Sequence, residues 1–260
     1  MVYERMPVFS TPAILLRRIN FGDYDLIINF FTLNKGKLSV IAKSAKKSTK
    51  RFSGTLELFS FLQIVVSAGR GKGLPVLQEA VIQHPFTNIR ADIKKTGYAS
   101  YWAELINEWM EDGVKQAQLF RLLQYVLEQL DGGKIPDPAL SILFQMRFTK
   151  LSGHSPNLRQ CCVCRTPLDK IKTNRILFDH QRGGLLCPDC STGVTGYSSL
   201  TKGTVKQLLW SEKKDLTQAG RIRFTSQAIK EGLEFLEAFV PYHLGKEPRS
   251  LKFLREIRES

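Results

Sequence analysis

The chain of 260 residues has little of three things: acidic side chains, cysteines outside one short segment, and long apolar runs. No stretch approaches the roughly 18 consecutive apolar residues that a membrane-spanning helix needs, so we expect no spanning segment. The first residues, MVYERMPVF, place Glu4 and Arg5 where a signal peptide would have its apolar stretch, and we expect no signal peptide. All five cysteines lie between residues 161 and 190, which indicates a reducing, cytoplasmic setting rather than a disulfide framework.

The common signatures of catalysis are also missing. The sequence has no P-loop, no G-x-G-x-x-G motif placed before a helix, and no serine, histidine and aspartate in the order of a known triad. Asp23 and Asp25 lie close together, but they lack the further carboxylates that a metal-dependent nuclease needs. We therefore interpret the chain as a binding protein and not as an enzyme.

Positive charge is what the chain has in excess. It carries 38 Lys and Arg against 24 Asp and Glu, which gives a net charge of +14. Both ends are basic, with 12 against 5 in residues 1–80 and 17 against 11 in residues 161–260, whereas residues 81–160 are nearly neutral. Such a charge favours a polyanionic partner, and nucleic acid fits better than a membrane because no basic amphipathic helix stands out.

The first eighty residues are typical of a small β-barrel. Turn signals and short β-rich runs alternate there, and no long helix intervenes. The expected strands cover residues 13–19, 25–33, 37–43, 56–68 and 74–82. A five-stranded domain of this size is typical of the OB-fold, a barrel that binds oligonucleotides.

From about residue 87 the apolar spacing becomes helical, so the sequence predicts an α+β protein. Tyr98, Tyr101, Trp102, Leu105 and Trp109 share one helix face, which we interpret as core. Helical spacing returns near the end of the chain, after a segment rich in cysteine, glycine and proline. The predicted division is an OB-fold domain at 1–83, a helical domain in two parts at 84–153 and 197–260, and a four-cysteine module at 154–196.

The four-cysteine module contains two C-x2-C pairs, CCVC and CPDC. Cys161 with Cys164, and Cys187 with Cys190, would each bring two thiolates to one metal ion, and four thiolates suit a structural zinc ion. Cys162 is set aside because the two-residue spacing favours Cys161, and the nearby His154 and His180 are not predicted as ligands. A redox pair and unmetallated core thiols remain as alternatives. Four thiolates leave no open position for catalysis.

A second cluster, in IAKSAKKSTKRFSG at residues 41–54, is basic. Five cations lie in nine positions without an acidic residue: Lys43, Lys46, Lys47, Lys50 and Arg51. A solvated loop is the ordinary interpretation of such a run. Its place after a barrel strand favours a nucleic-acid surface instead, to which Lys35, Lys37, Arg70 and Lys72 would add charge.

Aromatic residues near the basic run suggest what would accompany the phosphates. Phe30, Phe31 and Phe52 are candidate platforms for base stacking, although a core role is the better interpretation for at least one of the first two. No arginine is placed to read a base edge. The prediction is single-strand binding without strong sequence preference, with an affinity that falls as salt rises.

The order of these parts resembles the bacterial recombination mediators of the RecO family. The resemblance covers nearly the whole chain and rests on PAILLRRINFGDYDLIINFFTLNKGKLSVIAKSAKK, RFSGTLELFSFLQI, the CVC and CPDC pairs, and RSLKFL. It implies DNA-binding side chains at Lys43, Lys46, Lys47, Lys50 and Arg51, and zinc ligands at Cys161, Cys164, Cys187 and Cys190. The chain departs from many members at Arg165, where they have glycine.

The resemblance also implies a role and partners. Such proteins bind single- and double-stranded DNA and anneal complementary strands in DNA repair. With RecR they help to load the RecA recombinase onto strands coated by single-stranded-DNA-binding protein, whose acidic tail they engage. They act in the cytoplasm, at the nucleoid. The alternative is an RNA-binding or ribosome-associated protein, since OB barrels and zinc ribbons occur there too.

Overall fold

The computed structural model describes residues 8–48, 51–69, 73–193, 196–213, 215–219, 221 and 223–259. They form two compact units. The first runs as far as Gly132 and includes the end of the chain from Phe253, and the second spans Gly133–Lys252. The α+β fold class predicted from the sequence is confirmed. In the described part of the chain, no helix combines the length and the apolarity needed to cross a membrane.

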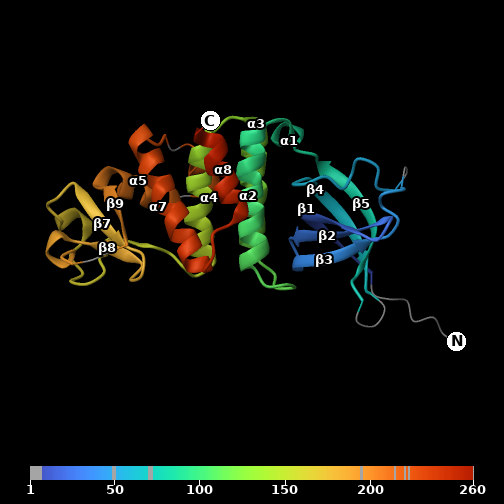
Figure 1. Cartoon of the computed structure of the whole chain (residues 1–260), viewed down its shortest axis with the longest axis horizontal. Helices are drawn as coiled ribbons and strands as arrows, with labels where there is room; N and C mark the ends of the chain where they lie inside the picture. The colour runs from blue at the N-terminus through green and yellow to red at the C-terminus, as the bar shows by residue number, and fades with distance from the viewer. Residues whose placement is uncertain are drawn as a thin grey trace. The chain divides into compact units, whose positions relative to one another are not determined.

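Five strands open the first unit: β1 (Val8–Phe21), β2 (Asp25–Thr32), β3 (Gly36–Ala42), β4 (Phe61–Ser67) and β5 (Val76–His84). They form a closed barrel in the order β1-β2-β3-β5-β4 (Figure 1). Every pairing is antiparallel except that of β3 with β5, which are parallel. The predicted strand at 56–68 begins only at Phe61, because residues 56–60 form turns and bends instead.

Alternating side chains fill the barrel. Ile28, Phe30 and Val40 are fully buried inside it, together with Ile64 and Val66 from β4. Residues between these positions on β2 and β3 face outward, because successive side chains of a strand point to opposite faces. The two faces of these strands therefore have separate roles: the inner face makes the core, and the outer face is left for helices or ligands.

Helices complete the first unit: α1 (Thr87–Ala91), α2 (Ile93–Trp109), α3 (Ala117–Gly132) and the last part of α8 (Arg249–Glu259). The Asp92 side chain caps α2 by accepting hydrogen bonds from the backbone of Lys94 and Lys95. Phe120 of α3 packs against barrel residues Phe31 and Phe61, with ring centroids 5.9 and 6.2 Å apart. The helices thus share a core with the barrel.

The second unit combines helices α4 (Asp137–Leu151), α5 (Lys202–Lys213), α6 (Leu216–Ala219) and α7 (Ser226–Leu244) with a small sheet. Its strands are β6 (Asn157–Cys161), β7 (Arg175–Asp179), β8 (Gly184–Leu186) and β9 (Tyr197–Thr201), in the order β6-β8-β7-β9. Phe178 of β7 packs against Phe235 and Phe239 of α7 at 4.7 and 5.5 Å, so sheet and helices share one core. The four-part division predicted from the sequence stays a prediction.

Candidate metal centre and nucleic-acid surface

The topology of the small sheet brings the two cysteine pairs together. Cys161 is the last residue of β6, and Cys187 follows β8 directly. Because β6 and β8 are parallel neighbours, both residues reach the same edge of the sheet. Cys164 lies in the turn after β6, and Cys190 ends the 3-10 helix Pro188–Cys190. Two local turns and one strand pair therefore assemble the cluster.

The four sulfur atoms have the spacing of a tetrahedral metal site. All of them lie within 4.8 Å of one another, and the sulfurs of Cys164 and Cys187 are 3.5 Å apart. Zinc–sulfur bonds of about 2.3 Å place the corners of a tetrahedron roughly 3.8 Å apart. Cys162, His154 and His180 are not in the cluster. The donor set and its geometry thus fit a metal ion held by four thiolates.

The environments of the thiols differ. A hydrogen bond with the Thr166 hydroxyl lowers the pKa of Cys164 to about 6. Burial opposes ionisation of Cys161, but backbone N–H groups, led by that of Cys187, hold its pKa below the usual value. The pKa of Cys187 is raised, first by burial, and hydrogen bonding with its sulfur raises the pKa of Cys190 to about 12. A bound cation would have to displace the protons of the last two.

Arg165, which stands where many proteins of the resembled family have glycine, adopts a backbone conformation that favours glycine. Its φ is +62°, in the left-handed region, and its N–H donates to the carbonyl of Cys161. A residue with a Cβ pays about 1 kcal/mol in this region. The turn between the first two ligands is therefore formed, and it stores a small strain.

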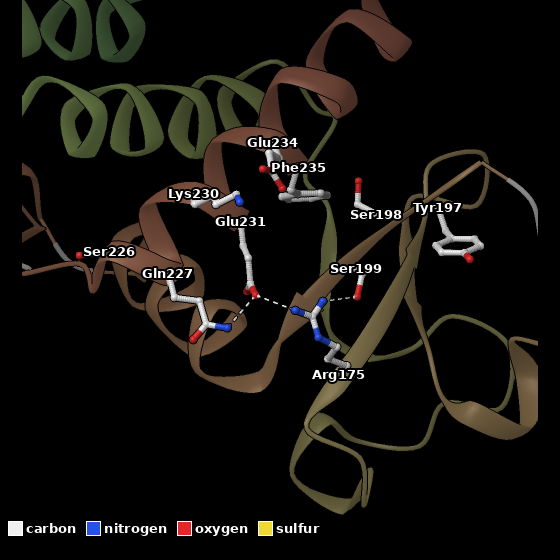
Figure 2. Close-up of a pocket in the computed structure, with 10 residues that line it drawn as sticks. All are labelled: Arg175, Tyr197, Ser198, Ser199, Ser226, Gln227, Lys230, Glu231, Glu234 and Phe235. Atoms are coloured by element: carbon white, nitrogen blue, oxygen red, sulfur yellow. Dashed lines mark hydrogen bonds and ion pairs between the residues drawn. The ribbon is translucent and has the colours of Figure 1, made fainter. Parts of the chain in front are cut away.

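A pocket of about 720 Å³ lies between β9 and α7 in the second unit (Figure 2). The Arg175 guanidinium lies between the Ser199 hydroxyl, at 3.0 Å, and the Glu231 carboxylate, at 4.0 Å. Arg175 and Lys230 balance Glu231 and Glu234, so the lining has no net charge to select an ion. Sequence reasoning did not identify this pocket.

Glu231 joins the sheet to α7. Its carboxylate is buried and accepts hydrogen bonds from the backbone and hydroxyl of Thr201 and from the hydroxyl of Thr204, at 2.9, 2.9 and 2.5 Å. Burial alone would raise the pKa of this carboxyl, but these donors, with Gln227, outweigh it and hold the pKa low. All of these partners belong to the protein, so we interpret the carboxylate as a structural link.

In the first unit, the basic loop (residues 43–51, of which 43–48 and 51 are described) lies on the turn between β1 and β2. Ser44 donates from its backbone to the Asp25 carboxylate at 2.7 Å, and Lys46 donates to the Tyr24 carbonyl at 3.0 Å. The guanidinium of Arg51 reaches back to the Lys43 carbonyl at 2.7 Å. Asp25, one of the two carboxylates weighed for a nuclease, thus has a structural partner.

The cations of the basic loop keep their charge available. The Lys46 ammonium donates to the Gly22 carbonyl at 3.0 Å, and that of Lys47 lies 3.4 Å from the centroid of the Tyr24 ring. Within the described residues, no carboxylate pairs with Lys43, Lys46, Lys47 or Arg51, and all four are exposed. Neutral groups hold the side chains of Lys46, Lys47 and Arg51 in place without cancelling their charge.

The remaining basic candidates lie elsewhere. Lys35 is exposed at the β2–β3 turn, at the opposite end of β3 from Lys43 and roughly 25 Å along the strand. The Lys37 ammonium bonds the Asn107 carbonyl at 2.7 Å and Asp112 at 3.2 Å, and the side chain is only 15% exposed. We therefore leave Lys37 out of the proposed surface. Lys50, Arg70 and Lys72 lie outside the described residues.

The predicted stacking platforms are in the core. Phe30 and Phe31 are fully buried and Phe52 is 4% exposed, so the suggestion that they stack on bases is wrong. Phe21 and Tyr24, which sequence reasoning missed, are exposed beside the basic loop instead. The sequence signal that could have identified them is the FGDY segment. Its glycine and aspartate indicate a turn at the end of the barrel, and aromatic side chains in such a turn do not reach the core.

Two grooves flank the basic loop. The polar groove, of about 490 Å³, is lined by Arg18, Lys46, Lys47, Ser48 and Ser53 among others. The apolar groove, of about 570 Å³, has Lys43 at its edge, with Phe21, Ile27, Ile41, Leu74 and Val76 in its lining. Each groove thus includes residues of the basic loop, but the rest of the lining is polar in one groove and apolar in the other.

Comparison with known proteins identifies relatives along the whole chain. The family described as "Recombination protein O N terminal" matches residues 6–86, and "Recombination protein O C terminal" matches residues 90–252. The chain is 47% identical over 254 residues to the DNA repair protein RecO of Desulfatibacillum aliphaticivorans, covering 97% of this chain and 98% of that one. It is 45% identical over 258 residues to the protein of that name from Desulfosudis oleivorans, covering 97% and 99%. The protein of that name from Syntrophus aciditrophicus is 33% identical over 251 residues, covering 96% of each chain.

Proposed function

The chain belongs to the RecO family of DNA repair and recombination proteins, and from this we propose that it is a non-enzymatic mediator that binds DNA on its barrel. It binds single and double strands, anneals complementary strands, and helps to load recombinase onto strands coated by single-stranded-DNA-binding protein. One observation carries the proposal: the cations of the basic loop are exposed, ordered by neutral partners, and placed between two barrel grooves.

The charge of the basic loop suits a backbone contact. Lysines that neutralise phosphates release condensed counterions, and this release supplies affinity without regard to sequence. A rigid loop also loses less side-chain entropy on binding than a mobile one. Annealing requires a surface that screens two polyanions while it leaves base edges free to pair. Phosphate contacts from Lys46 and Lys47 would meet that requirement.

The proposed partners follow from the family. They are RecR, the acidic tail of single-stranded-DNA-binding protein and, indirectly, RecA, and the proposed location is the cytoplasm, at the nucleoid. Membrane and RNA are not proposed as partners. The alternative of an RNA-binding protein predicts the same charged barrel, and the experiment below separates the two.

We propose zinc as the ion of the four-cysteine cluster, with Cys161, Cys164, Cys187 and Cys190 as ligands. Four cysteine sulfurs within 4.8 Å of one another are the donor set that zinc takes in structural sites. Zinc would hold two turns that have few apolar contacts of their own. The cluster therefore supports the fold of the second unit and takes no part in binding chemistry.

The test of DNA binding is a salt titration with three alanines, at Lys43, Lys46 and Lys47. Binding to an oligothymidine should weaken about ten- to a hundredfold at low salt, because three phosphate contacts are lost. The slope of log affinity against log salt should fall by about 2, since each contact contributes roughly 0.7. Fluorescence anisotropy at four salt concentrations measures both.

The matched control removes three exposed lysines from other places, Lys94, Lys115 and Lys134, and so lowers the net charge equally. It should leave the slope unchanged. Equal losses in both variants would show that the overall charge binds DNA and would contradict the proposal. Tighter binding to a structured RNA than to the oligothymidine at matched salt would favour the RNA alternative.

A further inference from the structure

A row of apolar side chains crosses the outer face of the barrel. The strand registers place Ile19 opposite Ile27, Ile27 opposite Ile41, and Ile41 opposite Val76, on four neighbouring strands. We call these four residues the apolar row. None belongs to the barrel core, whereas the residues next to Ile27 and Ile41 in the chain, Leu26, Ile28, Val40 and Ala42, all do. Side chains directly opposite across strands are about 4.5–5.5 Å apart, so the row is continuous.

The neighbouring part of the outer face is closed by a helix. Asn29, which pairs with Ser39 across the strands, donates from its side chain to Asn107 of α2 at 3.1 Å. Lys37 meets the same residue of α2. The apolar row lies beyond this contact, toward the loops, and Ile19 remains 37% exposed. The apolar row thus lies outside the contact between the barrel and α2.

The ends of the row carry two more exposed apolar side chains. Phe21 is 51% exposed and Leu74 is 40% exposed, and both line the apolar groove together with members of the row. Close to Leu74, the backbones of Gly69 and Gly73 approach each other, because a Cβ on Gly69 would lie 2.1 Å from the carbonyl oxygen of Gly73. Glycine at position 69 allows this close approach.

We propose that the apolar row, with Phe21 and Leu74, is the floor on which the bases of a single strand lie. This inference rests on the proposed DNA binding and adds that bases and phosphates contact different parts of the surface. Bases contact the apolar groove, where the Phe21 ring stacks on one of them, and phosphates contact Lys43 at its edge and Lys46 and Lys47 beyond. The face of Tyr24 is occupied by Lys47, so Phe21 is the ring that is free.

The charge at the edge of the groove argues for this occupant. A protein that buried an apolar segment here would have to bury or neutralise the Lys43 ammonium, which has no carboxylate partner among the described residues. A nucleotide matches both features: its flat base suits the apolar groove, and its anionic phosphate suits the Lys43 ammonium. Stacking of bases on protein side chains contributes about 1–3 kcal/mol per base and depends little on sequence.

The test compares an oligothymidine with an abasic oligomer that has the same number of phosphates. The wild-type protein should bind the oligothymidine at least about fivefold more tightly, the equivalent of one stacked base. The double variant F21A/L74A should lose most of this preference while the salt slope stays unchanged. A matched control, V81A/I82A, removes exposed apolar side chains of β5 outside the groove and should keep the preference.

The outcomes separate the two proposals. If the loop lysine variant weakens binding but the wild-type protein holds both oligomers equally, the base floor is wrong and the DNA-binding proposal stands. If F21A/L74A weakens both oligomers by the same factor, the groove does not recognise bases and the inference fails. If F21A/L74A leaves DNA binding intact but abolishes capture of a purified protein partner, the groove is a protein-docking face, which also overturns it.

Discussion

The two basic regions of the molecule use their charge in opposite ways. In the basic loop, Lys46 and Lys47 are held by a carbonyl and an aromatic ring, and their charge is not cancelled. In the second unit, Arg159, Arg175 and Arg182 each meet a carboxylate, at 3.7, 4.0 and 2.8 Å. Residues 1–80 and 161–260 have similar net charges. Whether that charge is available to a polyanion depends on the partners of each cation.

The comparison teaches that a count of cations does not locate a polyanion surface. An ion pair on the surface contributes little to stability, but it removes the field that a phosphate would meet. A cation fixed by neutral groups keeps that field and is already ordered. By this criterion we place the proposed DNA surface on the first unit, where the described cations of the basic loop have no carboxylate partner.

The largest predicted effect separates the units by removing the metal. Cys187→Ser should release about one zinc ion per chain and unfold the small sheet, because the binding free energy of structural zinc is coupled to folding. Oligothymidine binding by the barrel should change little. Metal analysis and hydrogen exchange of each unit would measure the two effects.

The control for the cysteine experiment is Cys162→Ser, which keeps the four ligands. Its zinc content and exchange rates should match those of the wild type. An equal zinc loss from both variants would mean that Cys162 takes part in the site. Metal analysis that finds no zinc in the purified wild-type protein would rule out a structural zinc altogether.

A smaller effect is predicted for the carboxylate that links the sheet to α7. Glu231→Gln removes the charge that four donors and Arg175 share, and it should destabilise the second unit by ~2–4 kcal/mol. The effect should diminish in acid: the pKa of this carboxyl is lowered by folding, so its stabilisation is lost as the pH falls through the folded-state value. Glu234→Gln, an exposed neighbour, is the control.

Denaturant unfolding, monitored by hydrogen exchange, would measure the stability of the second unit in both glutamate variants. The affinity for oligothymidine should remain the same in both glutamate variants, which sharpens the contrast between the units. A loss of DNA binding in E231Q at temperatures where the second unit stays folded would show that the pocket beside Glu231 contributes to the surface.

The smallest effect concerns the strained turn at Arg165. Arg165→Gly should stabilise the second unit by up to about 1 kcal/mol, because glycine adopts a positive φ without a Cβ penalty. The greater entropy of glycine in the unfolded chain opposes part of this gain. Binding of oligothymidine should not change, and a marked loss of affinity would assign Arg165 to the DNA surface.

The sequence was sufficient for the features that repeat or are spaced regularly. Turn signals and β-rich runs predicted the barrel strands, helical spacing predicted α2 and the helices near the end of the chain, and the C-x2-C spacing predicted the four cysteines that the sheet brings together. These features are local, or they rest on a short motif with a regular spacing. Such patterns can be recognised within one segment of the sequence, without knowledge of which other segments it contacts.

Contacts between distant segments were not predictable in the same way. Lys37 looked like the other lysines, and only the position of Asp112, 75 residues later in the chain, neutralises it. Phe30 and Phe31 are adjacent in sequence, and both are buried because α3 covers the face of β2 that carries Phe31. The apolar row needs the registers of four strands, which no single segment contains.

Hydrogen exchange of the wild-type chain, with and without saturating oligothymidine at low salt, tests the central claim most directly. Binding on the barrel predicts slower exchange at residues 19–27, 41–48 and 73–77, with little change in β7, β9 and α7. Protection confined to the second unit, with none at those barrel segments, would contradict the account.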